Sequence, residues 1–342
     1  MLLSLNPPAE IHIVAAPTEA FFLRVQLLAA SIRRYAGAFA SSRIVVTLSR
    51  DHEPWDVDAA FAWSRQLQVE WRWVDQAIWD AHGIYGSALA RFTYDYQSPY
   101  VIHLDADTLC TGALDELPAR TREALGGVIA HVAPSAFAIP FRDGRVHHGA
   151  AFWEELVAGA GLAPVPMTSE HTGWGLMDAD PARRWCPPYY NLGMLAGTRE
   201  VMSRVGGAVL EQLASVEAQV DTHFRCQLAV TLALAAVDAP SVDLSPAWNF
   251  PNDQLFRLGH GQAARDVRVL HYLRGGEFER ERDTASLAAL DGFLVRRLEQ
   301  PTNQLLQSVL RRLRDGLGPT ELPQPGARRS LLTLRADDAH VA

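Results

Sequence analysis

The sequence predicts an α/β fold in which a mostly parallel central sheet is covered by helices on both faces. Short apolar runs rich in β-branched residues alternate with amphipathic stretches over residues 11–107. Strands that alternate with helices in this way form parallel sheets that are covered on both faces. The chain has 342 residues, of which 48% are hydrophobic, so it can bury a large core.

The elements can be assigned in order from these patterns. Strands are predicted at IHIVAAP (11–17), SRIVVTLSRD (42–51), LQVEWRWVD (67–75), YVIHLDAD (100–107) and VRVLHYL (267–273). Helices are predicted at residues 19–37, around 88–96, and at 201–217 and 224–237. Regular structure is also expected at NLGMLAGTRE (191–200). The alternation of strands with helices indicates crossovers between parallel strands.

The chain divides into three parts. Residues 1–276 are expected to form the main domain. Within it, residues 131–189 are rich in Pro, Gly, His and Trp and lack a regular pattern, so we expect an insertion that faces the substrate. Residues 277–318 predict a helical extension, and residues 319–342 predict a disordered tail.

Two amphipathic helices are predicted in the extension. The first, in TASLAALDGFLVRRLEQ, has Asp283 or Thr284 as its N-cap and a leucine face made of Leu287, Leu290, Leu294 and Leu298. The second, in NQLLQSVLRRLRDGLG, is basic near its C-terminal end, at Arg311, Arg312 and Arg314. These arginines complement the helix dipole, and the alternative is contact with an anionic membrane surface.

The composition excludes several function classes. Acidic residues outnumber basic ones 39 to 31, giving a net charge of -8, so nucleic acid is not an expected partner. The chain contains no lysine, which argues against a P-loop, a protein kinase and a pyridoxal phosphate enzyme, because each relies on a lysine amine. Three cysteines, at widely separated positions, are too few for a disulfide framework or a cysteine-rich metal site.

We expect a cytoplasmic protein. The N-terminal stretch MLLSLNPPAE lacks the basic region of a signal peptide, and no run approaches about 18 apolar residues. The scattered cysteines also fit a reducing compartment. The oligomeric state does not follow from the sequence.

Two acids, Asp105 and Asp107, stand where the apolar run YVIHL ends. Ligands bind beyond the carboxyl ends of parallel strands, so the pair lies where a site is expected. Residues i and i+2 of an extended chain project to the same side, and paired carboxylates suit Mg²⁺ or Mn²⁺ that also contacts phosphate oxygens. The alternative is that the two acids only cap a turn.

Two other motifs compete for the same residues. An EF-hand loop that began at Asp105 would place Leu109 and Cys110 where an oxygen ligand and a glycine are required, so it is excluded. Phosphatases of the haloacid dehalogenase type also end a strand with D-x-D and would use Asp105 as the nucleophile. They normally carry Thr or Val where this chain has Leu109, and they use a basic residue, usually lysine. This alternative stays open but is weaker.

The segment VIHLDADTL resembles the D-x-D motif of nucleotide-sugar glycosyltransferases with the GT-A fold. It is most similar to family 8, which contains glycogenin-like and lipopolysaccharide galactosyltransferase-like enzymes. The resemblance extends over about residues 10–276 and would make this part a Rossmann-like GT-A domain. Five further features occur in the family's order, namely IHIVAAPT, SALARFTYDY, YYNLGML, DTHFRCQLAV and VRVLHYLRG.

The resemblance implies a metal and donor site. Asp107 would bind the metal, Asp105 would contact both metal and ribose, and His271 would complete the protein ligands. Arg91 would contact the donor sugar or diphosphate. The alternatives are a core histidine at His271 and a surface ion pair at Arg91. The family's lysine that holds the diphosphate is missing from HYLRGGEFERE, and Arg274 is the expected replacement, at a shorter spacing from His271.

Other residues would contact the substrates. The resemblance gives Asn191, Asp221 and Gln227 roles in catalysis or in holding substrate hydroxyls. The alternatives are a turn cap at Asn191, a helix N-cap at Asp221 and an exposed helix position at Gln227. The nucleotide would lie against the end of the first strand, at Ala15, Ala16 and Thr18. A second D-x-D at Asp178 and Asp180 follows no strand and predicts a solvated loop.

The sequence therefore predicts a hexosyltransferase that uses Mn²⁺ or Mg²⁺ and moves a sugar from a nucleotide-sugar, expected to be a UDP-sugar, to an unknown acceptor. The resemblance implies retention of the anomeric configuration. Aromatic residues that could stack on sugars are Trp153, Trp174, Tyr189, Tyr190 and Trp248, with a core position as the alternative. The rival functions are the phosphatase above and a non-catalytic nucleotide-sugar-binding protein.

Overall fold

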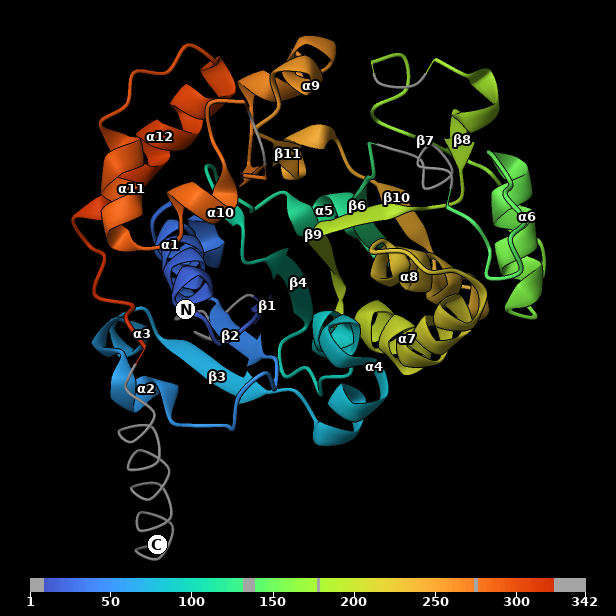
Figure 1. Cartoon of the computed structure of the whole chain (residues 1–342), viewed down its shortest axis with the longest axis horizontal. Coiled ribbons are helices and arrows are strands. Elements are labelled where there is room, and N and C mark those ends of the chain that lie inside the picture. Colours follow the sequence, from blue (N-terminus) through green and yellow to red (C-terminus); the bar gives the residue numbers. More distant parts are fainter. Residues whose placement is uncertain (1–8, 132–138, 177–178, 274–275, 323–342) are drawn as a thin grey trace, which may run out of the picture.

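The computed structural model describes residues 9–131, 139–176, 179–273 and 276–322. A seven-stranded sheet forms its centre, and only β9 runs antiparallel to its neighbours. In spatial order the strands are β10 (Ser241–Asp243), β6 (Leu125–Ile129), β9 (Tyr190–Thr198), β4 (Tyr100–Asp105), β1 (Glu10–Ala15), β2 (Arg43–Leu48) and β3 (Val69–Trp73). The predicted mostly parallel α/β fold is confirmed (Figure 1).

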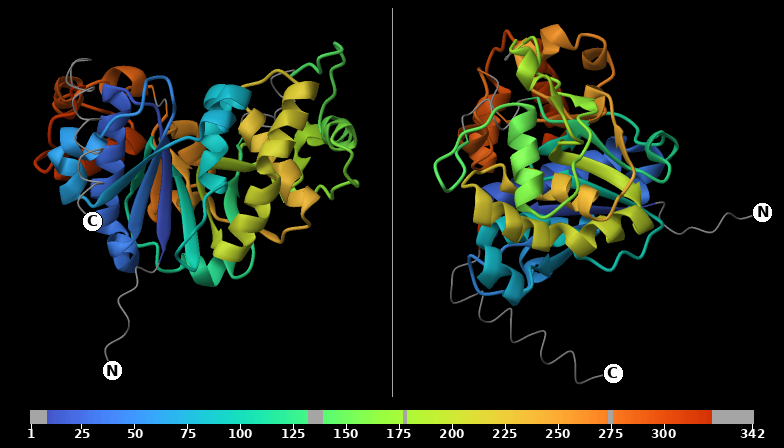
Figure 2. Two further views of the ribbon diagram at one scale, coloured as in Figure 1. Left: turned by 90° about the horizontal axis from the view of Figure 1, so that it is seen from below. Right: turned by 90° about the vertical axis from the view of Figure 1, so that its right-hand side faces the viewer.

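Helices cover both faces of the sheet (Figure 2). One face carries α1 (Glu19–Tyr35), α2 (Val57–Ala60), α3 (Ala62–Gln66) and α5 (Leu117–Thr121). The other carries α4 (Gln76–Leu89), α6 (Ala150–Gly159), α7 (Arg199–Gln219) and α8 (Arg225–Ala236). Alternate residues of β4 enter the two cores, Val101 on the α7 side and Ile102 on the α1 side. This is the two-sided burial expected of a central strand.

One predicted helix lies at a different place. The sequence placed it around residues 88–96, whereas α4 ends at Leu89 and only a short 3₁₀ turn follows it. Asp75 caps α4 by accepting a hydrogen bond from the Ala77 backbone N–H. Gly83 adopts non-helical backbone angles and breaks the helix, which obscured its periodicity in the sequence. The 3₁₀ helices are η1 (Gly37–Ser41), η2 (Ala90–Phe92), η4 (Pro181–Arg183), η5 (Pro246–Trp248) and η6 (Ala263–Arg265).

A small second sheet lies at the carboxyl end of β4. It consists of β11 (Phe250–Pro251), β12 (Val269–His271) and β5 (Thr108–Cys110), with β12 in the middle. β5 follows β4 after one turn and pairs antiparallel with β12. This sheet therefore brings a segment from far along the chain beside the D-x-D turn.

The predicted insertion at residues 131–189 is partly regular. It contains α6 and a two-stranded sheet of β7 (Ser169–Glu170) and β8 (Trp185–Cys186). The α6 side chains Phe152, Trp153, Leu156 and Val157 are buried in the core on the α7 side. These α6 side chains therefore add to the core, whereas His131 and Leu176 of the insertion line a cavity.

The C-terminal part packs on α1. After α9 (Gln254–Gly259), it contains α10 (Arg280–Asp283), α11 (Leu287–Leu294) and α12 (Pro301–Arg314). Leu290, Leu306 and Leu310 share one buried cluster with Leu23 and Leu27 of α1, and Figure 1 shows these helices beside α1. The extension thus packs on α1 through a third buried cluster, separate from the two on the faces of the sheet.

Two details of the C-terminal prediction are wrong. The N-cap of α11 is Ser286, which accepts a hydrogen bond from the Ala289 N–H, whereas Asp283 and Thr284 belong to the end of α10. The disordered tail was predicted to begin at residue 319, but Thr320 is buried and Leu322 packs against the core below α1. Residues 323–342 lie outside the described part of the chain.

The helices of the described residues include none that is both long enough and apolar enough to pass through a bilayer. Cys110, Cys186 and Cys226 are buried and free, in agreement with the absence of a disulfide framework in the sequence.

Candidate active site

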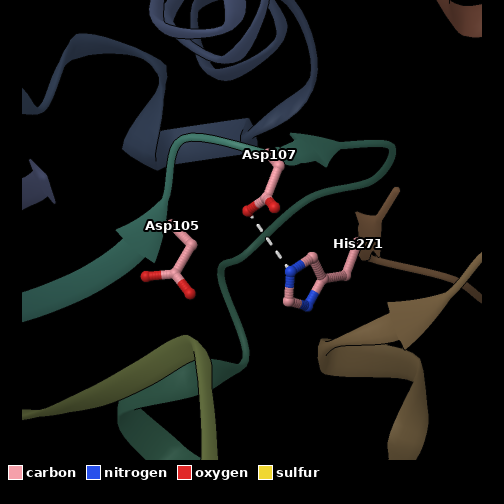
Figure 3. Close-up of side chains that lie close together, drawn as sticks. All are labelled: Asp105, Asp107 and His271. Carbon is pink, nitrogen blue, oxygen red and sulfur yellow. Dashed lines mark ion pairs between the residues drawn. The ribbon is translucent and has the colours of Figure 1, made fainter. Parts of the chain in front are cut away.

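The D-x-D motif forms a tight turn at the carboxyl end of β4. Asp105 is the last residue of β4, and Asp107 precedes β5. The Thr108 hydroxyl donates a hydrogen bond to the Asp105 carbonyl oxygen at 2.8 Å and closes the turn. Both carboxylates face the same space (Figure 3). The predicted position of the pair at the strand end is correct.

His271 reaches this turn from β12. The pairing of β12 with β5 places His271 opposite Thr108, and the Tyr272 backbone N–H donates to the Asp107 carbonyl oxygen at 3.0 Å. The His271 Nε2 lies 3.3 Å from Asp107 Oδ1. Ligand atoms of Asp105, Asp107 and His271 all lie within 4.8 Å of one another (Figure 3). The structure thus brings together the three residues predicted to bind metal.

This donor set fits a divalent metal ion. Ligands on opposite sides of an octahedral ion with bonds of about 2.1 Å lie about 4.2 Å apart, so only a small adjustment of these side chains is needed. Three protein ligands leave coordination positions for water or phosphate oxygens. Carboxylate and water oxygens suit Mg²⁺, Ca²⁺ and Mn²⁺, and an imidazole ligand is typical of sites for transition metals.

Arg91 is buried below Asp105. Its Nη1 lies 3.0 Å from Asp105 Oδ1, and its guanidinium also donates to the backbone carbonyl oxygens of Leu104 and Leu192. Arg91 is an ion-pair partner, as the alternative interpretation held, but it is fully buried and not on the surface. Its position fixes Asp105 and keeps the guanidinium away from the described cavity walls.

Arg280 is a site residue that the sequence did not reveal. It opens α10, and its Nη1 donates to Asp107 Oδ2. The other side of its guanidinium contacts Glu281. Arg280 stands in a run of alternating charges, GEFERERD, which gives no sign of which arginine turns inward. The predicted diphosphate ligand, Arg274, lies outside the described residues.

The electrostatics of the two carboxylates differ. Burial and the neighbouring Asp107 raise the pKa of Asp105, although Arg91 opposes the shift. Burial also disfavours the charge of Asp107, but His271 and Arg280 together hold its pKa well below the ordinary range. Burial alone would lower the pKa of His271, yet the Asp107 carboxylate raises it. Asp107 is therefore the more strongly anionic of the two.

Two cavities meet at this cluster. The first has a volume of about 570 Å³ and is lined by polar residues, including His131, Asn191, Gln227 and Asp253, together with Phe224 and Phe256. The second has a volume of about 240 Å³ and is mostly apolar, with Val14, Ala15, Ala16, Phe21, Ile84 and Ala88 in its wall. Asp105, Asp107 and Arg280 line both cavities. A ligand that occupied both would cross the acidic cluster.

Asn191 and Gly193 of β9 support the His271 ring. The Asn191 Oδ1 accepts hydrogen bonds from the Gly193 N–H at 2.9 Å and from the Asn249 Nδ2 at 2.8 Å. A Cβ atom on Gly193 would lie 2.5 Å from His271 Nδ1, so only glycine leaves room for the ring. Asn191 lies within β9 and not in a turn, so the predicted turn cap is wrong, and its side chain lines the first cavity.

Some of the other predicted site residues line the two cavities, and others lie away from them. Gln227 on α8 lines the first cavity. Ala15 and Ala16 line the second, whereas Thr18 lies outside the described lining and caps α1. Asp221 is exposed and pairs with Arg225 at 2.6 Å. The alternative role of Asp221 as an N-cap is wrong, because α8 begins at Arg225 with Phe224 as its N-cap residue.

The second D-x-D has no part in this site. Asp180 is exposed and caps the 3₁₀ helix η4 by accepting from the Ala182 N–H, as predicted for a solvated loop. Asp178 lies outside the described residues. Among the predicted aromatic platforms, the core interpretation holds for Trp153, Tyr189, Tyr190 and Trp248, which are all buried. The aromatic rings at the cavities are Phe21, Phe224 and Phe256.

Comparison with models of protein families shows which family the chain belongs to. The profile of the Rhodobacterales glycosyltransferase domain matches residues 13–202, which is more than half of the sequence and includes the D-x-D turn. The chain belongs to this glycosyltransferase family. The protein is therefore a glycosyltransferase enzyme, and the matched segment runs from β1 to the start of α7. No curated protein matches the sequence.

Solved structures of glycosyltransferases share the fold. The galactosyltransferase LgtC, solved in complex with donor and acceptor sugar analogues, has a TM-score of 0.51 at 16% identity, covering 92% of this chain and 98% of LgtC. The bifunctional glycosyltransferase WbbM has a TM-score of 0.51 at 14% identity and covers 91% of this chain. This chain spans 53% of WbbM, about half its length. These neighbours agree with a GT-A fold and with the resemblance to family 8.

Proposed function

We propose that the protein transfers a hexosyl group from a UDP-sugar to an acceptor, with a divalent metal, preferably Mn²⁺, bound by Asp105, Asp107 and His271. One observation carries this proposal. The three ligands converge at the point where an apolar cavity and a larger, more polar cavity meet. A nucleotide-sugar has the matching order of parts, with a flat base at one end, a charged diphosphate in the middle and a sugar at the other.

The second cavity would hold the nucleoside. Its wall combines the small side chains of Ala15 and Ala16 with the ring of Phe21, which suits a flat base. Asp105 lines this cavity as well, so its carboxylate can accept a hydrogen bond from a ribose hydroxyl. The first cavity would hold the sugar and the acceptor, where the side-chain amides of Asn191 and Gln227 can orient hydroxyl groups.

The diphosphate would lie against the residues shared by both cavities. Arg280 is the guanidinium at this point, and it can donate two hydrogen bonds to phosphate oxygens. We assign it the role that a lysine plays in family 8. A divalent ion at Asp105, Asp107 and His271 would supply charge stabilisation for the leaving diphosphate.

The proposal also covers the stereochemistry of transfer and the two alternative functions. We propose retention of the anomeric configuration, on the resemblance to family 8, and NMR of the product anomer tests it. The phosphatase and the non-catalytic binding protein are not favoured, because the chain belongs to a glycosyltransferase family.

The decisive experiment measures metal-dependent nucleotide binding. We expect UDP to raise the melting temperature more in the presence of Mn²⁺ than with a chelator, since the ion and the diphosphate stabilise each other in the site. Asp107→Asn should remove the metal-dependent part of this shift and lower the rate of UDP release from UDP-sugars by about 100-fold or more. Asp180→Asn changes the exposed D-x-D and serves as the matched control, with no change expected. Equal shifts with and without metal in the unmodified protein would contradict the proposal.

A further inference from the structure

The acidic cluster is already neutralised by the protein itself. Asp105 pairs with Arg91, and Asp107 pairs with Arg280 and His271. Two carboxylates therefore face two permanently charged guanidinium groups. A divalent cation added to this arrangement would bring two further positive charges next to them. Such an addition is unfavourable unless one guanidinium leaves or an anion arrives with the ion.

The two arginines differ in their freedom to leave. The Arg91 side chain is 1% exposed, and hydrogen bonds to two backbone carbonyl oxygens hold its guanidinium in place. The Arg280 side chain is 31% exposed and sits at the first position of a four-residue helix. Its second partner, Glu281, is 61% exposed. Arg280 is thus freer to rotate away from Asp107 than Arg91 is to leave Asp105.

Arg280 also has a second possible partner, the proposed donor diphosphate. It lines both cavities at the point where the proposed diphosphate would lie. A phosphate group offers a guanidinium a charge-assisted, two-pronged contact of the same kind as a carboxylate. When Arg280 leaves, Asp107 Oδ2 is released for a metal ion, and Oδ1 stays 3.3 Å from His271 Nε2.

We propose that Arg280 takes the place of the cation at Asp107 in the free enzyme and moves to the donor diphosphate on binding, so that metal and nucleotide bind cooperatively. This inference rests on the proposed function and adds a regulation of the same site. Each ligand favours the arrangement that the other requires: the diphosphate draws Arg280 away from the metal ligand, and the metal displaces Arg280 toward the diphosphate. By linkage, the gain in Mn²⁺ affinity caused by the nucleotide equals the gain in nucleotide affinity caused by Mn²⁺.

The experiment is a titration of Mn²⁺ into the full-length protein, followed by the EPR signal of the free ion, without and with saturating UDP. For the unmodified protein we expect weak binding of Mn²⁺ alone and much tighter binding with UDP. In Arg280→Gln, Mn²⁺ alone should bind about tenfold more tightly, since Asp107 loses a competing charged hydrogen bond. The enhancement by UDP should shrink by at least the same factor. Arg280→Lys retains the charge and should stay close to the unmodified protein.

The matched control is Arg282→Gln, which removes the same charge from the same helix at a side chain that pairs with Asp283. No change in Mn²⁺ affinity is expected there. If Arg280→Gln weakens UDP binding but leaves the affinity for Mn²⁺ alone unchanged, Arg280 only holds the diphosphate and the inference is overturned. An equal effect of Arg282→Gln overturns it too, since a general charge effect would then account for the result. If the unmodified protein binds neither UDP nor Mn²⁺ through Asp107, the proposed function itself fails.

Discussion

The His271 ring is held in place by the absence of a side chain at Gly193. The nearest atoms to a Cβ built on Gly193 are His271 Nδ1 at 2.5 Å and Asn249 Oδ1 at 2.7 Å. Both distances are far below van der Waals contact, so one of the two side chains would have to move. The ring faces Asp107 on its other side. A methyl group at residue 193 would therefore push on the His271 ring, which is one of the three proposed metal ligands.

We predict that Gly193→Ala lowers the affinity for Mn²⁺ by about 10- to 100-fold, the usual effect of disturbing the residues that orient a metal ligand. The loss of unfolding free energy should be modest, about 1–3 kcal/mol, as for other overpacked sites. Calorimetric titration with Mn²⁺ and urea denaturation measure the two effects. Gly207→Ala is the control, because this glycine has open space around it. Unchanged Mn²⁺ binding in Gly193→Ala would show that the ring does not bind the ion.

At the scale of elements, the C-terminal helices hold the strand that carries His271. Asn252 follows β11, and its backbone N–H donates to the His271 carbonyl oxygen at 3.1 Å. Its side chain accepts from the Leu273 N–H and donates to Asn303 on α12 at 3.0 Å. Asn252 and Asn303 are both fully buried. α12 is thus linked to the backbone of His271 and Leu273 through one buried amide pair.

We predict that Asn303→Leu weakens both the fold and the metal site. The substitution leaves the Asn252 amide N–H groups in an apolar setting, which costs about 1–3 kcal/mol of unfolding free energy. The freed Asn252 side chain should also loosen the Leu273 backbone, and Mn²⁺ affinity should fall several-fold. Gln307→Leu is the matched control, because Gln307 lies on the same helix and donates to the carbonyl oxygens of Phe293 and Arg296.

The comparison of the two variants separates stability from positioning. Gln307→Leu should cost a similar unfolding free energy in urea denaturation but leave Mn²⁺ binding unchanged, since its partners lie at the end of α11 and just after it. If both variants lower Mn²⁺ affinity equally, the effect is a general loss of stability, and the amide pair has no special role in placing His271.

At the scale of the whole molecule, the sequence predicts what local patterns determine. The sheet, most of its helices and the place of Asp105 and Asp107 follow from apolar runs and from the rule that sites lie at strand ends. His271 could be predicted only through the family resemblance, because its position depends on the pairing of β12 with β5. Such non-local pairing leaves no periodic signal in the sequence.

Arg280 and Arg91 show the limit more clearly. Arg91 lies in a mixed segment and Arg280 in a charged one. Neither local pattern indicates that the arginine turns toward the acidic pair. The three-dimensional placement of α10 decides that Arg280 and not Arg282 turns toward Asp107. The packing of η2 under β4 decides that Arg91 lies beneath Asp105. Side-chain direction of this kind is set by tertiary contacts, which the sequence alone does not specify.

A buried polar cluster below β1 links the stability of the whole domain to pH. His12 is fully buried, and its Nε2 lies 3.0 Å from Glu10 Oε2. The rings of Tyr94, Tyr96 and His103 pack around it. Burial lowers the pKa of His12, and the positive charges of Arg43 and Arg72 act in the same direction, while Glu10 opposes them. The neutral imidazole is thus the form that the fold requires.

The sign of the pH effect follows. In the unfolded chain a histidine takes up a proton below about pH 6.5, whereas the folded protein keeps His12 neutral to a lower pH. The unfolded state then binds more protons, so the unfolding free energy should fall as the pH drops below about 6.5, by up to about 1.4 kcal/mol per pH unit for this residue. The lowered pKa of Glu10 adds a further loss in more acidic solution.

Urea denaturation at pH 7.0 and pH 5.5 measures this effect, and His12→Gln isolates it. Glutamine keeps an N–H that can donate to Glu10 but cannot take up a proton, so the loss of unfolding free energy between the two pH values should be about 1 kcal/mol smaller than in the unmodified protein. His52→Gln removes an exposed histidine and should leave the loss unchanged. An identical loss in His12→Gln and the unmodified protein would mean that His12 takes up its proton in the folded state as readily as in the unfolded chain, which the packing of Tyr94 and Tyr96 against its ring argues against.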